Sequence, residues 1–134
     1  MEITRETDYA IRCLLYLSKK KHLPTVVDEI AQEMAIPKSF LSKIVQKLNR
    51  AGLLESFRGV KGGFKLTREP EAISLLDVIS VMQGPVASNR CAVDKRACNF
   101  SCTCVVHPVW LDLRKMTEDY LSKINFEDMS GQCR

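Results

Sequence analysis

The sequence lacks the patterns that mark secreted, membrane and repeat proteins. Its first residues, MEITRETDYAIRC, place five charged side chains before any apolar run, which is not the pattern of a secretory signal. No uninterrupted apolar segment approaches the roughly 20 residues that a membrane-spanning helix needs. Internal repeats and low-complexity segments are also absent. We therefore expect a cytoplasmic protein without a membrane partner, built as one compact domain with a protruding element.

Catalytic patterns are absent as well. The chain has no phosphate-binding loop, no dinucleotide fingerprint and no serine–histidine–acid set. Its two histidines, His22 and His107, are poor candidates for a catalytic pair. We expect neither enzymatic activity nor a small-molecule substrate.

Basic residues, in contrast, are concentrated in one region. Residues 37–68 contain eight lysines and arginines and a single acid, which gives this segment +7, whereas the whole chain carries +4. Such a block is typical of a protein that binds an anionic partner, although a solvated basic face gives the same pattern. Because no amphipathic membrane anchor accompanies the block, nucleic acid is the favoured partner.

The periodicity of apolar residues predicts a mainly α-helical fold with one hairpin. We expect a helix over residues 7–19 capped by Thr7 or Asp8, a shorter one within 25–35, and a third over 37–51. The sequence LLESF-RGVKGG-FKL predicts a β-hairpin, and further helices are expected over 74–83 and from His107 to Ile124. Phe40, Leu41, Ile44, Val45 and Leu48 are expected to form the buried face of the third helix.

Three helices followed by a basic hairpin are the order of elements in a winged helix-turn-helix domain. The third helix would then place its polar face in the major groove of DNA, and the hairpin would contact the DNA at its tip. Ser39, Ser42 and Lys43 are candidates for contacts with base edges, and Lys47 and Lys61 for contacts with phosphate.

The last expected helix has an apolar stripe that no later segment is long enough to cover. Val109, Leu113, Met116 and Tyr120 belong to this stripe. For a DNA-binding protein, pairing with a second copy is favoured, because a two-fold dimer matches two half-sites. We therefore expect a homodimer.

Four of the six cysteines lie between Cys91 and Cys104, and His107 follows shortly after. In a cytoplasmic protein, clustered cysteines bind metal or do redox chemistry more often than they form stable disulfides. An iron–sulfur cluster, a structural zinc ion, and a thiol or disulfide switch are all compatible with this segment.

Four stretches of the sequence resemble a known family of bacterial regulators. TDYAIRCLLYL, SFLSKIVQKLNRAGLL, RGVKGGFKL and ISLLDVISVMQGP are similar to the Rrf2-type winged-helix regulators, which include the iron–sulfur regulator IscR and the nitric-oxide sensor NsrR. The resemblance covers residues 1–124. It implies a homodimer that pairs through the long C-terminal helix and binds a near-palindromic DNA operator.

The resemblance also implies a set of cluster ligands. Cys91, Cys98, Cys104 and His107 fall where the IscR type places three cysteines and a histidine, with one more residue between the first two cysteines. Asp8 stands where the NsrR type has an aspartate ligand, and Cys102 is an additional thiol, so both are alternates for the fourth position. The cofactor implied is a [2Fe-2S] or a [4Fe-4S] cluster. In the hairpin, Arg58 and Gly59 correspond to the part of the family's wing that enters the minor groove.

The expected organisation is a winged helix-turn-helix domain over 1–84, a cysteine-rich segment over 85–106, a dimerisation helix over 107–126 and a flexible tail over 127–134. The expected function is a transcriptional regulator whose operator binding responds to iron, redox or nitric-oxide status through the cluster. Two alternatives remain open. One is a regulator of the same fold that holds zinc or uses its thiols directly, and the other is an iron–sulfur electron carrier or cluster-transfer protein.

Overall fold

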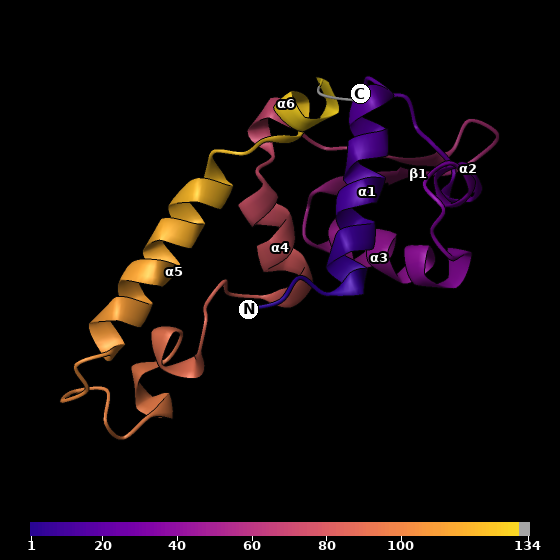
Figure 1. Ribbon diagram of the computed structural model, residues 1–134. Coiled ribbons are helices and arrows are strands. Elements are labelled where there is room, and N and C mark those ends of the chain that lie inside the picture. Colours follow the sequence, from indigo (N-terminus) through magenta and orange to yellow (C-terminus); the bar gives the residue numbers. More distant parts are fainter. Residues whose placement is uncertain (132–134) are drawn as a thin grey trace.

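The computed structural model describes residues 1–131, which form a helical domain with a small hairpin and a long helix projecting from it (Figure 1). In this part of the chain the α-helices are α1 (Arg5–Lys19), α2 (Val27–Glu33), α3 (Lys38–Arg50), α4 (Leu75–Gln83), α5 (His107–Ser122) and α6 (Phe126–Gly131). The strands are β1 (Leu54–Phe57) and β2 (Gly63–Leu66), and the short 3-10 helices are η1 (Pro70–Ala72), η2 (Arg90–Ala92) and η3 (Lys95–Ala97).

One hydrophobic core joins α1, α3, α4 and α6. The inner face of α3 consists of Leu41, Ile44, Val45 and Leu48, all of which are buried as the helical spacing predicts. Helix α1 covers them with residues such as Leu14. This helix begins earlier than expected, because Thr4 caps it by accepting a hydrogen bond from the Thr7 amide.

The hairpin is the wing that the sequence predicts. Strands β1 and β2 are antiparallel, with Leu54 opposite Leu66 and Phe57 opposite Gly63. The neighbouring residue Phe64 also pairs with Thr25, through two backbone hydrogen bonds of 2.8 and 2.9 Å. Gly63 has φ of +138°, and a Cβ there would lie 2.5 Å from the Thr25 carbonyl oxygen. Glycine is therefore required where the wing crosses the segment before α2.

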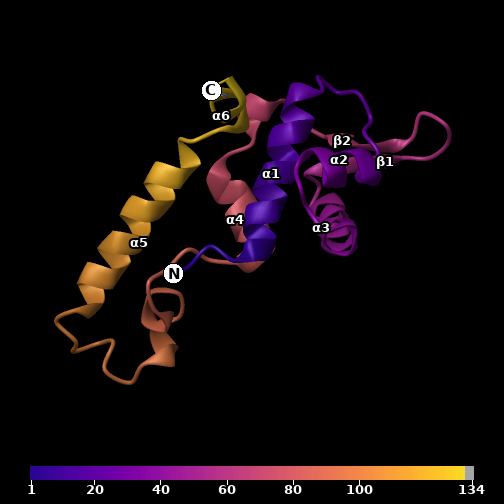
Figure 2. The same cartoon turned by 45° about the vertical axis from the view of Figure 1, so that its right-hand side comes forward.

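Helix α4 begins with a capping box. The Ser74 hydroxyl accepts from the Asp77 amide, and the Asp77 carboxylate accepts from the Ser74 amide. The chain then leaves the domain through residues 85–106, which we call the cysteine segment, and returns along α5. Both views show α5 and the cysteine segment standing away from α2, α3 and the wing (Figures 1 and 2).

Helix α6 corrects one expectation from the sequence. Residues 127–131, expected to belong to a flexible tail, are helical, and α6 packs against α1 and η1. Phe126, at its start, is completely buried, and its amide donates to the Ile73 carbonyl at 3.1 Å. The amide of Leu75 donates in turn to the carbonyl of Ile124 at 2.8 Å. The segment is ordered because an aromatic ring and backbone hydrogen bonds attach it to the core. Residues 132–134, with Cys133, lie outside the described part.

Phe40 is a second correction. The sequence places it on the buried face of α3, but 53% of its surface is exposed. At the first turn of the helix it lies on the flank of the buried face, with its ring centroid 6.2 Å from that of Tyr9. Within residues 1–131, no helix is long and apolar enough to cross a membrane.

Candidate DNA-binding surface and cysteine segment

The first turns of α3 present the polar residues that the sequence predicts for base contacts. Ser39 and Lys43 are exposed. Ser42 is half-buried, and its hydroxyl donates to the Lys38 carbonyl one turn earlier at 3.0 Å. Ser39 and Lys43 are four residues apart and share one helix face, so both are available to a ligand that lies along α3. The Ser42 hydroxyl can still accept a hydrogen bond.

Lys47 is already engaged within the chain. Its ammonium donates to the carbonyl of Met82 at 2.9 Å. Met82 lies in the last turn of α4, where carbonyls have no partner within the helix. Lys47 therefore attaches α3 to α4, and contact with a phosphate would require its ammonium to exchange or share this bond.

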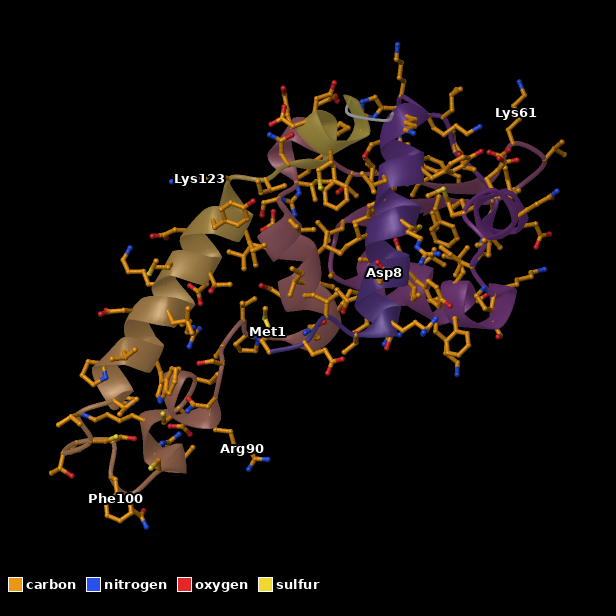
Figure 3. The ribbon with its side chains drawn as sticks, viewed as in Figure 1. Met1, Asp8, Lys61, Arg90, Phe100 and Lys123 are labelled. Carbon is orange, nitrogen blue, oxygen red and sulfur yellow. The ribbon has the colours of Figure 1, made fainter. Side chains whose placement is uncertain are left out.

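The wing presents a second basic site. Arg58, Gly59 and Lys61 are exposed, and Lys61 projects from the loop between the two strands (Figure 3). Gly59 has φ of +100°, a conformation that favours glycine. The loop also exposes Val60 completely. An exposed loop with two cations is suited to a polyanion.

Phe40 joins this surface, although its spacing in the sequence predicts a position in the core. It precedes Lys43 by one turn and is exposed on the same half of the helix. Its position 100° from Ser39 around the helix axis, between the polar and the buried faces, is the signal that could have identified it.

The cysteine segment holds thiols with different exposure. Cys98 and Cys102 are exposed, whereas Cys91 and Cys104 are half-buried. The Cys91 thiol lies 3.4 Å from the Asn89 side-chain oxygen, to which it donates. Cys104 is near the start of α5, where its carbonyl accepts from the His107 amide. None of these four cysteines forms a disulfide in the structure.

His107 is the most unusual side chain near the cysteines. It is only 7% exposed, and its Nδ1 is buried without a hydrogen-bond partner. The hydroxyl of Ser101, in the cysteine segment, is also buried without a partner. A buried polar atom without a partner costs about 1–3 kcal/mol, so each calls for an explanation.

The donor set fits an iron–sulfur cluster in its chemistry but is not assembled as a cage. Thiolates and an imidazole nitrogen are cluster ligands, and the free Nδ1 of His107 is such a donor. Among residues 1–131, however, no group of three or more histidine, cysteine or acidic side chains is close enough to hold a metal ion. The segment would have to close around a bound group.

The two alternates for the fourth ligand differ in position. Cys102 lies in the cysteine segment and is exposed. Asp8 lies on α1, where its carboxylate pairs with Arg12 at 2.9 Å. It is far from Arg90 and Phe100, which mark the cysteine segment (Figure 3), and the same separation of α1 from the segment is visible in Figure 2. The structure therefore does not bring Asp8 together with the cysteines of its own chain.

One face of α5 is apolar and exposed. Met116 is 69% and Tyr120 66% exposed, and Leu113 accompanies them. Together with residues of α1 and α4 they line an apolar groove of about 450 Å³. The residues that line it are Met1, Ile3, Ile11, Leu75, Ile79, Leu113, Met116, Thr117, Tyr120 and Leu121. Continuous apolar surface of this kind marks an interaction site.

Comparison with known proteins identifies relatives over almost the whole chain. Residues 3–132 match the family model Rrf2, described as an iron-dependent transcriptional regulator. The chain is 29% identical over 132 residues to the HTH-type transcriptional regulator CymR of Bacillus subtilis (strain 168), covering 98% of this chain and 91% of that protein. It is also 29% identical over 130 residues to the regulator IscR of Vibrio cholerae, covering 96% and 75%. The solved structure of CymR, the global cysteine regulator of B. subtilis, covers 100% of this chain and 99% of its own, with a TM-score of 0.81 and 27% identity.

Proposed function

Since the chain belongs to the Rrf2 family of transcriptional regulators, we propose that it is a homodimer whose affinity for a near-palindromic operator depends on an iron–sulfur cluster in the cysteine segment. As a member of that family it is a DNA-binding regulator and not an enzyme.

Two exposed basic sites support the assignment of the DNA-binding surface. Ser39, Ser42 and Lys43 are assigned to the major groove, where lysine donates to guanine and serine is permissive. Arg58, with Gly59, is assigned to the minor groove and Lys61 to the backbone. Lys47 is assigned to phosphate, in competition with its bond to the Met82 carbonyl.

Substitution of the lysines separates these roles. Lys61→Ala should weaken binding to every duplex. It should also make the slope of log K against log salt concentration less steep by about 1, as expected for one lost phosphate contact. Lys43→Ala should change the preference among operator variants instead. The measurement is fluorescence anisotropy with a duplex series at several salt concentrations. If both variants only reduce affinity uniformly, the assignment of Lys43 to base contacts is wrong.

Pairing through α5 is supported by its exposed apolar face and the groove beside it. A second copy of the same face would cover Leu113, Met116 and Tyr120 and place two recognition helices on one duplex. Tyr120→Glu should convert the dimer to a monomer in sedimentation experiments, because the carboxylate would be buried without a partner. Lys123→Glu, an exposed change near the end of the same helix, is the matched control.

The cluster is assigned to Cys91, Cys98 and Cys104 with His107 as the fourth ligand. The observation that carries this assignment is the buried, unpartnered Nδ1 of His107, whose backbone amide donates to the carbonyl of Cys104. Bound there, a [2Fe-2S] or [4Fe-4S] cluster would supply one-electron redox chemistry and sensitivity to oxidants. His107 begins α5, so its orientation links the cysteine segment to the helix assigned to dimerisation.

The deciding experiment is anaerobic purification with iron, sulfide and zinc analysis and a visible spectrum. His107→Ala should change the spectrum and shorten the cluster's lifetime in air, whereas His22→Ala, at an exposed histidine, should change neither. Asp8→Ala tests the alternate, and an effect there would assign the fourth ligand to Asp8, contributed by a partner subunit. Colourless protein without iron would refute the cluster, and one equivalent of zinc would assign the segment to a structural metal.

A thiol-based regulator is the second candidate, because the relative CymR is named as a cysteine regulator and because Cys98 and Cys102 are exposed. In that case the iron-free protein should lose operator affinity on treatment with peroxide and regain it with a reductant. Cys98→Ser and Cys102→Ser should abolish the response, and mass spectrometry would identify the oxidised thiol.

A further inference from the structure

Arg114 connects α5 to the cysteine segment. Its side chain is 30% exposed, and its guanidinium donates through Nη1 to the Ala92 carbonyl at 2.6 Å. Nε of the same group donates to the carboxylate of Glu118, one turn further along α5. Among the described residues, the bond to Ala92 is the only side-chain hydrogen bond between η2 and α5.

The residue that Arg114 contacts is the immediate neighbour of Cys91. Ala92 is nearly fully buried, and η2 packs against α5. Arg114 follows His107 by seven residues, which is two helical turns, so both side chains lie on the same face of α5. The contact thus holds the start of the cysteine segment against the helix face that also carries the buried imidazole.

The chemistry of the contact makes it specific for arginine. A guanidinium has several donors in a fixed plane and can bind a carboxylate and a carbonyl at the same time, which the single ammonium of lysine does less well. Glu118 orients the group, and the Ala92 carbonyl receives a charge-assisted hydrogen bond, which is stronger than a neutral one.

We propose that Arg114 is a positioning residue, which holds the η2 end of the cysteine segment, and with it Cys91, against the face of α5 that carries His107. The inference deepens the proposed function and rests on it where the cluster is concerned. Removal of the guanidinium should release η2 from α5, because within residues 1–131 the structure provides no other side-chain hydrogen bond between η2 and α5. Cys91 should then become more accessible, whereas thiols elsewhere should not.

The test uses the full chain without a cluster, reduced and under nitrogen. Iodoacetamide is added for a series of times, and mass spectrometry gives the alkylation rate of each cysteine. Arg114→Met keeps the aliphatic stem and removes the donors, and should accelerate alkylation of Cys91 by about three- to tenfold. Lys115→Met is the matched control, because Lys115 makes the same type of i,i+4 pair, with Asp119 at 2.9 Å, and has no hydrogen bond to the segment.

Cys13 reports on the whole fold, because its side chain is fully buried in the core. If Cys13 and Cys91 accelerate together in Arg114→Met, the substitution acts on global stability and the proposal is overturned. Glu118→Gln is the second variant. It leaves the guanidinium in place but weakens its anchor, and should accelerate Cys91 less than Arg114→Met does, with Cys13 unchanged. An unchanged Cys91 rate in both variants also overturns the proposal.

Reconstitution with iron and sulfide separates this inference from the proposed function. Arg114→Met should give a cluster with a shifted visible spectrum and a shorter lifetime in air, and Lys115→Met should match the unmodified protein. If the unmodified protein assembles no cluster but Cys91 still responds to Arg114→Met, the cluster proposal fails and the positioning of Cys91 stands. If clusters in all variants are identical, the positioning role is refuted.

Discussion

Substitution of Phe126 by alanine tests whether the C-terminal helix is an integral part of the domain. The ring is completely buried in the hydrophobic core, where α6 packs against α1 and η1. A phenylalanine side chain buries about 150–250 Å², which at about 25 cal/mol per Å² corresponds to an upper bound of about 4–6 kcal/mol. Measured Phe→Ala substitutions in cores cost about 3–5 kcal/mol, and we expect this range here.

The expected loss is a large part of the total stability, which for a domain is about 5–15 kcal/mol. The backbone hydrogen bond from the amide of residue 126 to the Ile73 carbonyl does not depend on the ring. The substitution therefore measures the packing of the Phe126 side chain alone. The assay is urea unfolding at a fixed protein concentration, followed by helical circular dichroism and by the fluorescence of the single tryptophan, Trp110.

Phe100→Ala is the control, because Phe100 is 70% exposed at the tip of the cysteine segment and should change the free energy of unfolding by less than about 0.5 kcal/mol. A loss below about 1 kcal/mol for Phe126→Ala would refute the role of α6 as an anchor and would agree with a flexible tail.

The other predictions concern a cap, a turn, a buried thiol and an exposed ring. Ser74→Ala removes the N-cap of α4 and should lower the free energy of unfolding by about 1 kcal/mol in urea titrations. Lys21 has φ of +48° in a turn closed by the Leu23 amide and the Lys20 carbonyl at 3.1 Å; Lys21→Gly should therefore raise the thermal midpoint, with a gain of about 0.5–1 kcal/mol. Burial raises the pKa of Cys13 from 9.0 to about 12, so the unfolded thiol ionises before the folded one. Its contribution to stability is complete below pH 9 and is lost as the pH rises toward 12, by up to about 1.4 kcal/mol per pH unit. Cys13→Ala should lack this part of the slope in unfolding titrations at alkaline pH. Finally, Phe40 is available for apolar contact with a thymine methyl group; replacing operator thymines one at a time by deoxyuridine should weaken binding at one position, and Phe40→Ala should abolish that difference.

The helical part of the fold could be predicted because its signals are local. The spacing of Leu41, Ile44 and Leu48 identifies the inner face of α3, and Ser74 identifies the start of α4. The flank position of Phe40 is also a local signal, but its exposure could not be predicted, since an apolar residue beside a buried face has the same spacing whether another element covers it or not.

The candidate sites were predictable to different degrees. The basic residues of α3 and the wing follow from charge and element order, and the structure leaves Lys43 and Lys61 exposed. The cysteine-rich segment follows from composition, and the ligand set with His107 follows from the resemblance to the family, but the exposure of the thiols and the unpartnered Nδ1 required coordinates. Lys47 has the same sequence signal as Lys43, and only packing against α4 distinguishes the two.

By itself, the sequence determined the order of the elements, the basic block, the cysteine-rich segment and the resemblance to a family, because each of these depends on residues that lie close together along the chain. Only the tertiary structure decided that Phe126 belongs to the core, that Lys47 bonds to Met82, and that Arg114 holds the residue next to Cys91. These contacts join residues 22 or more positions apart. They depend on how packed helices meet in space, and helical periodicity carries no information about such pairs.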